Sequence, residues 1–339
     1  MSAVARIERS ISSRNHVRAR RWLARNFRVL IAYGLLLGLL ALYAYLQPRL
    51  FTLPVITATA NQGMSLVFAG MGQTAVVITG GIDLSIGSIV SLTNCLASTI
   101  FGDSVFSVVG GFFLVLGVGT LAGLINGLIV VYTRLQPIVV TLATASVYNG
   151  LALFLRPVPG GSVPGWYTEL LTGRVLDVIP SSLVCLGLVV LIVWVPFRQS
   201  RIGLWAYALG SNETSAFMSG LNVNRAKLIS YAVGGLCAAM GGLFLSAQTS
   251  SGNATIGAIY TLQSIAAVVL GGTSLLGGVG GIMGTIAGAF VLRIISSVLF
   301  FAKVNPLSQP FFEGVVLLIA VLVGATRLLT LRNKLDSLR

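Results

Sequence analysis

The sequence is dominated by apolar stretches of about 20 residues, separated by short polar segments, from Val29 to Leu329. A helix needs about 20 mainly apolar residues to cross a bilayer. Of the 339 residues, 55% are hydrophobic and only 9% are charged, which leaves no room for a large soluble domain. We therefore predict an all-α polytopic membrane protein with about ten transmembrane helices. The expected spans are 29–46, 55–79, 85–101, 106–132, 138–155, 179–197, 227–248, 260–278, 281–302 and 309–326.

Basic residues gather at the ends of these spans. The first 28 residues contain eight arginines, and the positive-inside rule places such a segment in the cytoplasm. An even number of spans puts the C-terminus on the same side, so that 17 Lys and Arg residues face the cytoplasm, 4 lie outside and Arg293 falls within a span. The expected domains are a basic cytoplasmic segment at 1–28, a transmembrane domain at 29–326 and a cytoplasmic tail at 327–339. The apolar run after Arg28 is longer than the core of a typical signal peptide, so we expect it to be retained.

Two connections are longer than the others. The outer one, 156–178, contains RPVPGGSVPGWYTEL, whose prolines and glycines favour an ordered surface loop or a short interfacial helix. The inner one, 198–226, contains GSNETSAF, in which capping residues precede residues compatible with a helix. We expect a short helix at the membrane surface there.

A weak internal echo indicates that the chain has two related halves. AVVITGGIDL at 75–84 resembles AVVLGGTSLL at 267–276, and GTLAG at 119–123 resembles GTIAG at 284–288. Two halves built on one pattern are common in transporters. Glycine-rich apolar sequence also produces such echoes by chance, so a pseudo-repeat and coincidence both stay open.

Asp83 is an acidic residue between two expected spans, in the segment GGIDLSIGSI. Ionisable groups inside a membrane are costly and usually face a cavity, a partner or a transport path. One interpretation is a structural cap on a helix that begins at Leu84, favoured by the helix dipole. The other is a group that takes part in transport.

Uncharged polar residues punctuate the spans. Each could bond a neighbouring helix, or could face a shared path and bond a solute rich in hydroxyl groups. The translocation-path candidates are Asn61, Gln62, Asp83, Asn94, Asn126 and Gln248.

Glycines recur at four-residue spacing. Small residues at this spacing let helix backbones approach closely within lipid. The residues expected to pack helices in this way are Gly119, Gly123, Gly127, Gly277, Gly281, Gly284 and Gly288.

Several classes of chemistry are excluded by what the chain lacks. None of the three lysines follows a glycine, so the P-loop pattern of ATPases does not occur. The only histidine, His16, lies in the basic segment, and Cys95, Cys185 and Cys237 lack metal-site spacing. The net charge of +14 follows from membrane topology and does not indicate a nucleic-acid partner. We predict no catalytic residue, no metal and no cofactor in this chain.

Five blocks, taken together and in this order, resemble the membrane permeases of ribose-type sugar ABC importers. They are GGIDLSIGSIVSLT (80–93), AGLINGLIV (122–130), QPIVVTLAT (136–144), ALGSNETSAFMSGLNVNRAKLISYAVGGLCAAMGGL (208–243) and AAVVLGGTSLLGGVGGIMGTIAGAFVL (266–292). The resemblance covers roughly residues 55–325. It implies the permease subunit of a binding-protein-dependent importer for a monosaccharide or related polyol, in the bacterial inner membrane.

The same resemblance implies partners. These are a cytoplasmic ABC ATPase that binds ATP and Mg²⁺, a periplasmic sugar-binding protein, and a second permease that is either an identical copy or a paralogue. The inner loop then couples the permease to the ATPase through Gly210, Asn212, Glu213, Ala216, Gly220 and Leu221. The alternative is a stand-alone secondary transporter or channel for a small polar solute, with Asp83 as its ion site.

Overall fold

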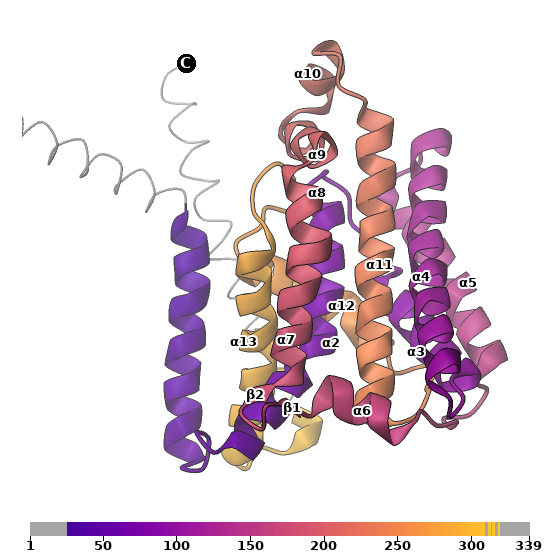
Figure 1. Ribbon diagram of the computed structural model, residues 1–339. Coiled ribbons are helices and arrows are strands. Elements are labelled where there is room, and N and C mark those ends of the chain that lie inside the picture. Colours follow the sequence, from indigo (N-terminus) through magenta and orange to yellow (C-terminus); the bar gives the residue numbers. More distant parts are fainter. Residues whose placement is uncertain (1–25, 309–310, 313, 316–317, 319–339) are drawn as a thin grey trace, which may run out of the picture.

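The computed structural model describes residues 26–308, 311–312, 314–315 and 318. Most of the expected tenth span at 309–326, most of the basic segment 1–28 and the tail 327–339 lie outside the described residues. The described chain is a helical bundle with a two-stranded sheet at one end (Figure 1).

The helices follow the apolar stretches of the sequence. They are the N-terminal helix Asn26–Leu46, α2 Leu53–Val77, α3 Ile86–Ile100, α4 Val105–Thr133, α5 Pro137–Leu155, α6 Gly165–Thr172, α7 Ser181–Val189, the π-helix η1 Val190–Trp194, α8 Val195–Gln199, α9 Arg201–Ser211, α10 Glu213–Met218, α11 Val223–Thr249, α12 Ala258–Leu270, α13 Ile282–Phe301 and the 3₁₀-helix η2 Pro306–Ser308. Strands β1 (Arg174–Val175) and β2 (Ile179–Pro180) form the antiparallel pair.

Six described helices are long and apolar enough to cross a membrane. They are Asn26–Leu46, α4, α5, the continuous segment Ser181–Gln199, α11 and α13. The apolar helices α3 and α12 are shorter, with 15 and 13 residues. This pattern supports a polytopic membrane protein.

The expected span 260–278 is wrong at its C-terminal end, because α12 ends at Leu270. Gly272 and Gly277, at φ +82° and +88°, adopt the left-handed conformation that favours glycine and interrupts a helix. Residues 271–281 therefore form a connection, which we call the α12–α13 loop.

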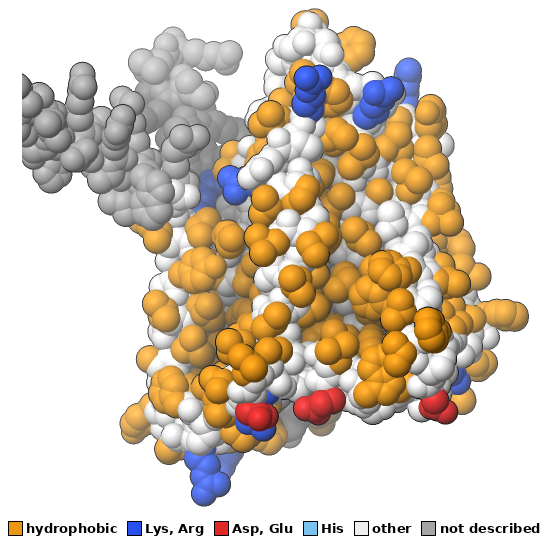
Figure 2. Space-filling view, viewed as in Figure 1, with side chains coloured by type: hydrophobic (Ala, Val, Ile, Leu, Met, Phe, Trp, Pro, Cys, Tyr) orange, Lys and Arg blue, Asp and Glu red, His pale blue; other side chains and the backbone are white. Residues whose placement is uncertain are grey.

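The centre of the bundle is α11, which packs along α2, α3 and α4. Every residue of α2 from Gly63 to Val77 is buried. On the face seen in Figure 2, apolar side chains cover the middle of the molecule and charged ones gather towards its two ends. One end carries α9 and α10 and the other carries α6 and the sheet (Figure 1), and we name them the α10 end and the α6 end.

Five of the seven expected packing glycines lie in helices at close contacts. Gly119, Gly123 and Gly127 of α4 face α11, and Gly284 and Gly288 of α13 face the C-terminal part of α12 and Gly271 just after it. The other two, Gly277 and Gly281, lie in the α12–α13 loop and not within a helix. Their four-residue spacing matched the pattern of helix-packing glycines because the loop is itself rich in glycine and leucine.

Candidate functional site

Asp83 lies in the connection between α2 and α3 and is fully buried. Its Oδ1 accepts hydrogen bonds from the Ser85 backbone N–H at 2.8 Å and the Ser85 hydroxyl at 2.6 Å. The expected helix start at Leu84 is wrong, because α3 begins at Ile86 with Ser85 as its N-cap. The carboxylate therefore fixes the turn that leads into α3.

Side chains from three other helices complete this polar cluster. Asn126 of α4 donates to the Ser85 hydroxyl at 2.7 Å and lies 3.5 Å from Asp83 Oδ2. Tyr148 of α5 has its hydroxyl 3.1 Å from Asn126 Oδ1. With its amide turned to satisfy both groups, Gln73 of α2 bonds the backbone C=O and N–H of Asp83 at 2.9 and 3.2 Å. The buried cluster thus joins α2, α3, α4 and α5.

The six candidates for the translocation path do not line one common cavity or path. Asp83 and Asn126 belong to the buried cluster. Asn94 bonds the backbone of Ser251 and Asn253 at 3.1 and 2.8 Å, and so holds the connection between α11 and α12. The other three lie apart, since Asn61 donates to the Thr172 carbonyl at 2.6 Å and the side chains of Gln62 and Gln248 are exposed.

At the α6 end, the loop 156–178 is ordered. It contains α6 and the β1–β2 hairpin, and Gly160 forms a reciprocal pair of backbone bonds with Gly252, at 2.9 and 2.8 Å. Arg156 donates to the Ser98 carbonyl at 2.5 Å. The loop 156–178 and the connection 249–259 therefore lie side by side and form one surface.

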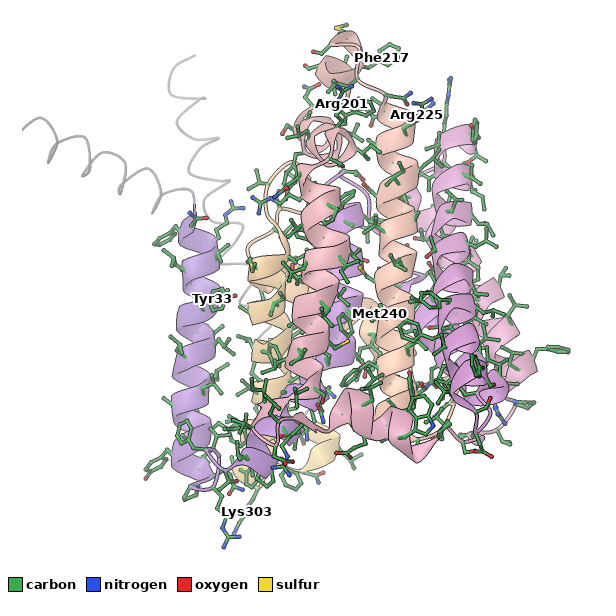
Figure 3. All side chains as sticks on the ribbon, viewed as in Figure 1. Tyr33, Arg201, Phe217, Arg225, Met240 and Lys303 are labelled. Atoms are coloured by element: carbon green, nitrogen blue, oxygen red, sulfur yellow. The ribbon has the colours of Figure 1, made fainter. Side chains whose placement is uncertain are left out.

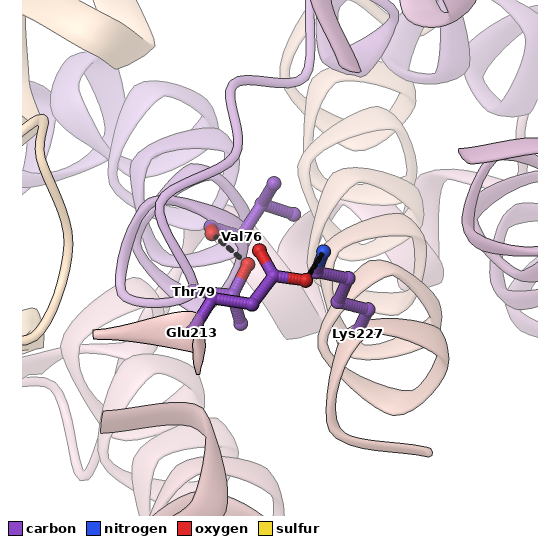
Figure 4. Close-up of polar contacts among 4 residues, drawn as sticks. All are labelled: Val76, Thr79, Glu213 and Lys227. Atoms are coloured by element: carbon purple, nitrogen blue, oxygen red, sulfur yellow. Dashed lines mark hydrogen bonds and ion pairs between the residues drawn. The ribbon is translucent and has the colours of Figure 1, made fainter. Parts of the chain in front are cut away.

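At the α10 end, the connection 198–226 folds into α9 and α10. Asn212 caps α10, its Oδ1 accepting from the Ser215 N–H at 2.8 Å, and Asn222 caps α11 by accepting from the Arg225 N–H at 2.9 Å. An ion pair of 2.6 Å joins Glu213 to Lys227 (Figure 4). The short helix expected here is present, and both this helix and the one that follows it are capped.

Close backbone contacts join α9 to the rest of the bundle. Gly210 of α9 lies against the Ile78 carbonyl at the end of α2 and against Gly278, and a side chain on Gly210 would overlap both. The Gly278 N–H donates to the Ile78 carbonyl at 2.9 Å, and Tyr207 donates to the Gly280 carbonyl at 2.9 Å. Burial raises the pKa of Tyr207, so its hydroxyl stays a donor. We call this contact of Gly210, Ile78 and Gly278 the α9–α2 junction.

The tip of α10 carries two large apolar side chains that sequence analysis missed. Phe217 is 72% exposed and Met218 is 81% exposed. Figure 3 shows Phe217 at the extremity of the molecule, in the same region as Arg201 and Arg225. The sequence feature that could have revealed them is the adjacent Phe-Met pair, because the residues around it in the loop are mostly small or polar.

Comparison with known proteins places this chain in a family. A family profile described as "Branched-chain amino acid transport system / permease component" matches residues 55–321. The ribose import permease protein of Escherichia coli strain K12 is 37% identical over 85% of this chain and 91% of its own length. The chain belongs to the ribose-type permeases of ABC importers.

Two further relatives agree with this assignment. The autoinducer 2 import system permease protein of Photorhabdus laumondii subsp. laumondii is 33% identical over 90% of this chain and 91% of its own length. The galactose/methyl galactoside import permease protein of E. coli strain K12 is 28% identical over 87% of this chain and 93% of its own length. No solved structure gives a significant match.

Family membership gives the geometry a context. The permease is a multi-pass protein of the bacterial inner membrane and a transport subunit. An importer permease of this family works with an ATPase and a substrate-binding protein. The two ends of the bundle each present an ordered loop surface that reaches beyond the apolar band (Figures 1 and 2).

Proposed function

We propose that this permease forms the path of an ATP-driven importer for a monosaccharide or related polyol. The three relatives support this solute class, because their names specify ribose, galactose or methyl galactoside, and autoinducer 2. The family profile is described for branched-chain amino acids, but these relatives align with at least 85% of the chain. A stand-alone transporter would need Asp83 as an ion site, and its carboxylate already bonds Ser85.

We place the coupling between the permease and its ATPase at the tip of α10. Large exposed apolar side chains at the end of a loop are typical of protein interfaces. Phe217 and Met218 therefore dock into the partner ATPase, which binds ATP and Mg²⁺, while the capped helix α10 holds them in place. Of the residues expected to couple, Gly210 of α9 contacts the end of α2 and Gly278, and Ala216 is the buried residue of α10.

The topology follows from the same proposal. The α10 end is cytoplasmic and carries Arg198, Arg201 and Arg225, in agreement with the positive-inside rule. The α6 end is periplasmic, both termini are cytoplasmic, and ten spans cross the membrane. Gly80 and Gly272 occupy equivalent positions of the sequence echo and have φ +83° and +82°, which supports two related halves. A second permease, identical or paralogous, completes the path.

Co-purification tests the importer assignment. In mild detergent from native membranes, the wild-type chain should bring a P-loop ATPase in about equal amount, and Phe217→Asp should lose it, because a charge cannot enter an apolar groove without a partner. Phe217→Leu, which keeps an apolar side chain, should retain the ATPase. Recovery of the wild-type chain alone, moving solute in liposomes without ATP, would establish the stand-alone transporter instead.

The surface at the α6 end is the proposed dock for the binding protein. Deleting Pro159 to Pro164 should reduce the stimulation of ATP hydrolysis by the binding protein several-fold, because it removes half of the Gly160–Gly252 pairing. Val163 within the segment is buried, so Val158→Asp is the milder variant, since Val158 is 72% exposed. Stimulation should fall in both variants while ATP hydrolysis without binding protein is unchanged. Full stimulation of Val158→Asp and of the deletion would place the dock elsewhere.

A further inference from the structure

Arg293 is the one described basic residue that lies in the middle of a membrane-length helix. It is the twelfth of 20 residues in α13. At about 1.5 Å per residue it lies roughly 17 Å from the α10-end start of the helix and roughly 12 Å from the other end. The other described Lys and Arg residues lie in loops or near helix ends. A guanidinium at this depth is expensive unless it faces protein or water.

The described chain only partly satisfies this guanidinium. Its Nε donates to the Gln62 carbonyl of α2 at 3.1 Å. Within the described residues the ion pairs comprise Lys227–Glu213 alone, so no carboxylate there balances the charge of Arg293. Arg293 is half-buried and its terminal amino groups have no hydrogen-bond acceptor among the described residues. The terminal hydrogen-bond donors of Arg293 therefore have no acceptor among the described residues near the middle of α13.

Gln62 adds to the same polar spot. Its side chain is exposed, and its amide has no hydrogen-bond partner among the described residues. Gln62 is the last exposed residue of α2, since every residue from Gly63 to Val77 is buried. Towards the α6 end, α2 instead exposes Ala58 and Pro54 on the same stripe. The guanidinium of Arg293 thus bonds the backbone of a residue whose own side-chain amide is exposed, at the point where the exposed part of α2 ends.

We propose that Arg293 and Gln62 form a solute contact within the translocation path and bind a hydroxyl-rich solute. The proposal rests on the proposed function. The terminal amino groups of Arg293 donate to hydroxyl oxygens, and the Gln62 amide can both donate and accept, which suits a polyol. Water in the path hydrates the guanidinium between transport events, and this removes the penalty of an arginine in lipid. The contact lies away from the buried Asp83 cluster, which then has a structural role.

Thiol labelling tests whether Gln62 and Arg293 are accessible to water, and the test does not depend on the solute or the energy source. In a chain with Cys95, Cys185 and Cys237 replaced by alanine, Gln62→Cys and Arg293→Cys should react with a charged, membrane-impermeant methanethiosulfonate. The matched control is Leu191→Cys, an apolar side chain of η1 that is 64% exposed and also lies away from the helix ends. It should react at least tenfold more slowly. Equal protection of all three positions, or equal reaction of all three, would overturn the proposal.

Transport measurements then test the contact itself. Arg293→Gln should lower solute uptake about tenfold, as expected for the loss of charge-assisted hydrogen bonds, while stimulated ATP hydrolysis continues. Arg293→Lys, which keeps a cationic donor, should retain most uptake. A purely structural arginine would instead lower thermal stability and ATP hydrolysis together. Glu313 lies outside the described residues, and if Glu313→Gln reproduced the full defect, an ion pair within the chain would replace the proposal.

Discussion

Replacing Gly123 by valine is expected to prevent the permease from folding, whereas the same change at Gly117 of the same helix is expected to be tolerated. A Cβ on Gly123 would overlap the Tyr231 carbonyl of α11 and lie 3.0 Å from the Cα of Gly235. Gly235 in turn meets the backbone of Gly119 and Gly123, so neither helix can yield by moving a side chain. A Cβ on Gly117 has no heavy atom within 4 Å.

The size of the effect follows from where the contact lies. Overpacking a core with side chains costs about 1–3 kcal/mol, and here backbone meets backbone, so we expect at least about 3 kcal/mol. α11 also packs on α2 and α3, so a displaced α11 disturbs the whole bundle. The measurement is the folded, monodisperse fraction in mild detergent and its melting temperature. A Gly123→Val protein that melts with the wild type would show that α4 and α11 pack less closely than described.

The fold was largely predictable because each membrane-length helix corresponds to an apolar stretch of the sequence. The prediction failed at the end of α12, where LGGTSLLGGVGG is apolar enough to extend a span. Hydropathy does not register that Gly272 and Gly277 take positive φ angles. The loop is instead fixed by tertiary contacts, such as the bond from the Gly278 N–H to the Ile78 carbonyl, which no local pattern reveals.

The candidate site was less predictable, because its partners are distant in the chain. Asp83 stood out as a buried acid, but Asn126 lies 43 residues away and Tyr148 comes from yet another helix. Sequence reasoning grouped Asp83 with Gln62 and Gln248 as candidates for the translocation path, and the structure separates them. How deep a residue lies, how exposed its side chain is and which group it bonds all depend on how the helices pack. The presence of a polar side chain in the sequence therefore could not show which of these residues lie together.

Gly210→Ala is expected to abolish uptake while the bundle stays folded. The added methyl group would overlap both the Ile78 carbonyl and the Gly278 nitrogen that donates to it, so α9 has to move away from the end of α2. If α10 docks on an ATPase, as proposed, the α9–α2 junction is the place where movement of α10 reaches α2 and, through the connection after Ile78, the Asp83 cluster. Uptake should fall at least about tenfold, in line with losing the contact that transmits the movement.

The controls separate a coupling defect from misfolding. Gly150→Ala adds the same methyl group to α5, where a Cβ would have no heavy atom within 4 Å, and should transport normally. Tyr207→Phe removes one hydrogen bond to Gly280 but leaves the backbones in contact, so it should keep most uptake. In Gly210→Ala the ATPase should still co-purify, while its activity no longer rises when the binding protein is added. If stimulated hydrolysis and uptake both persisted, the α9–α2 junction would be a packing contact and movement would have to pass from α10 directly into α11, through the Glu213–Lys227 pair that joins them.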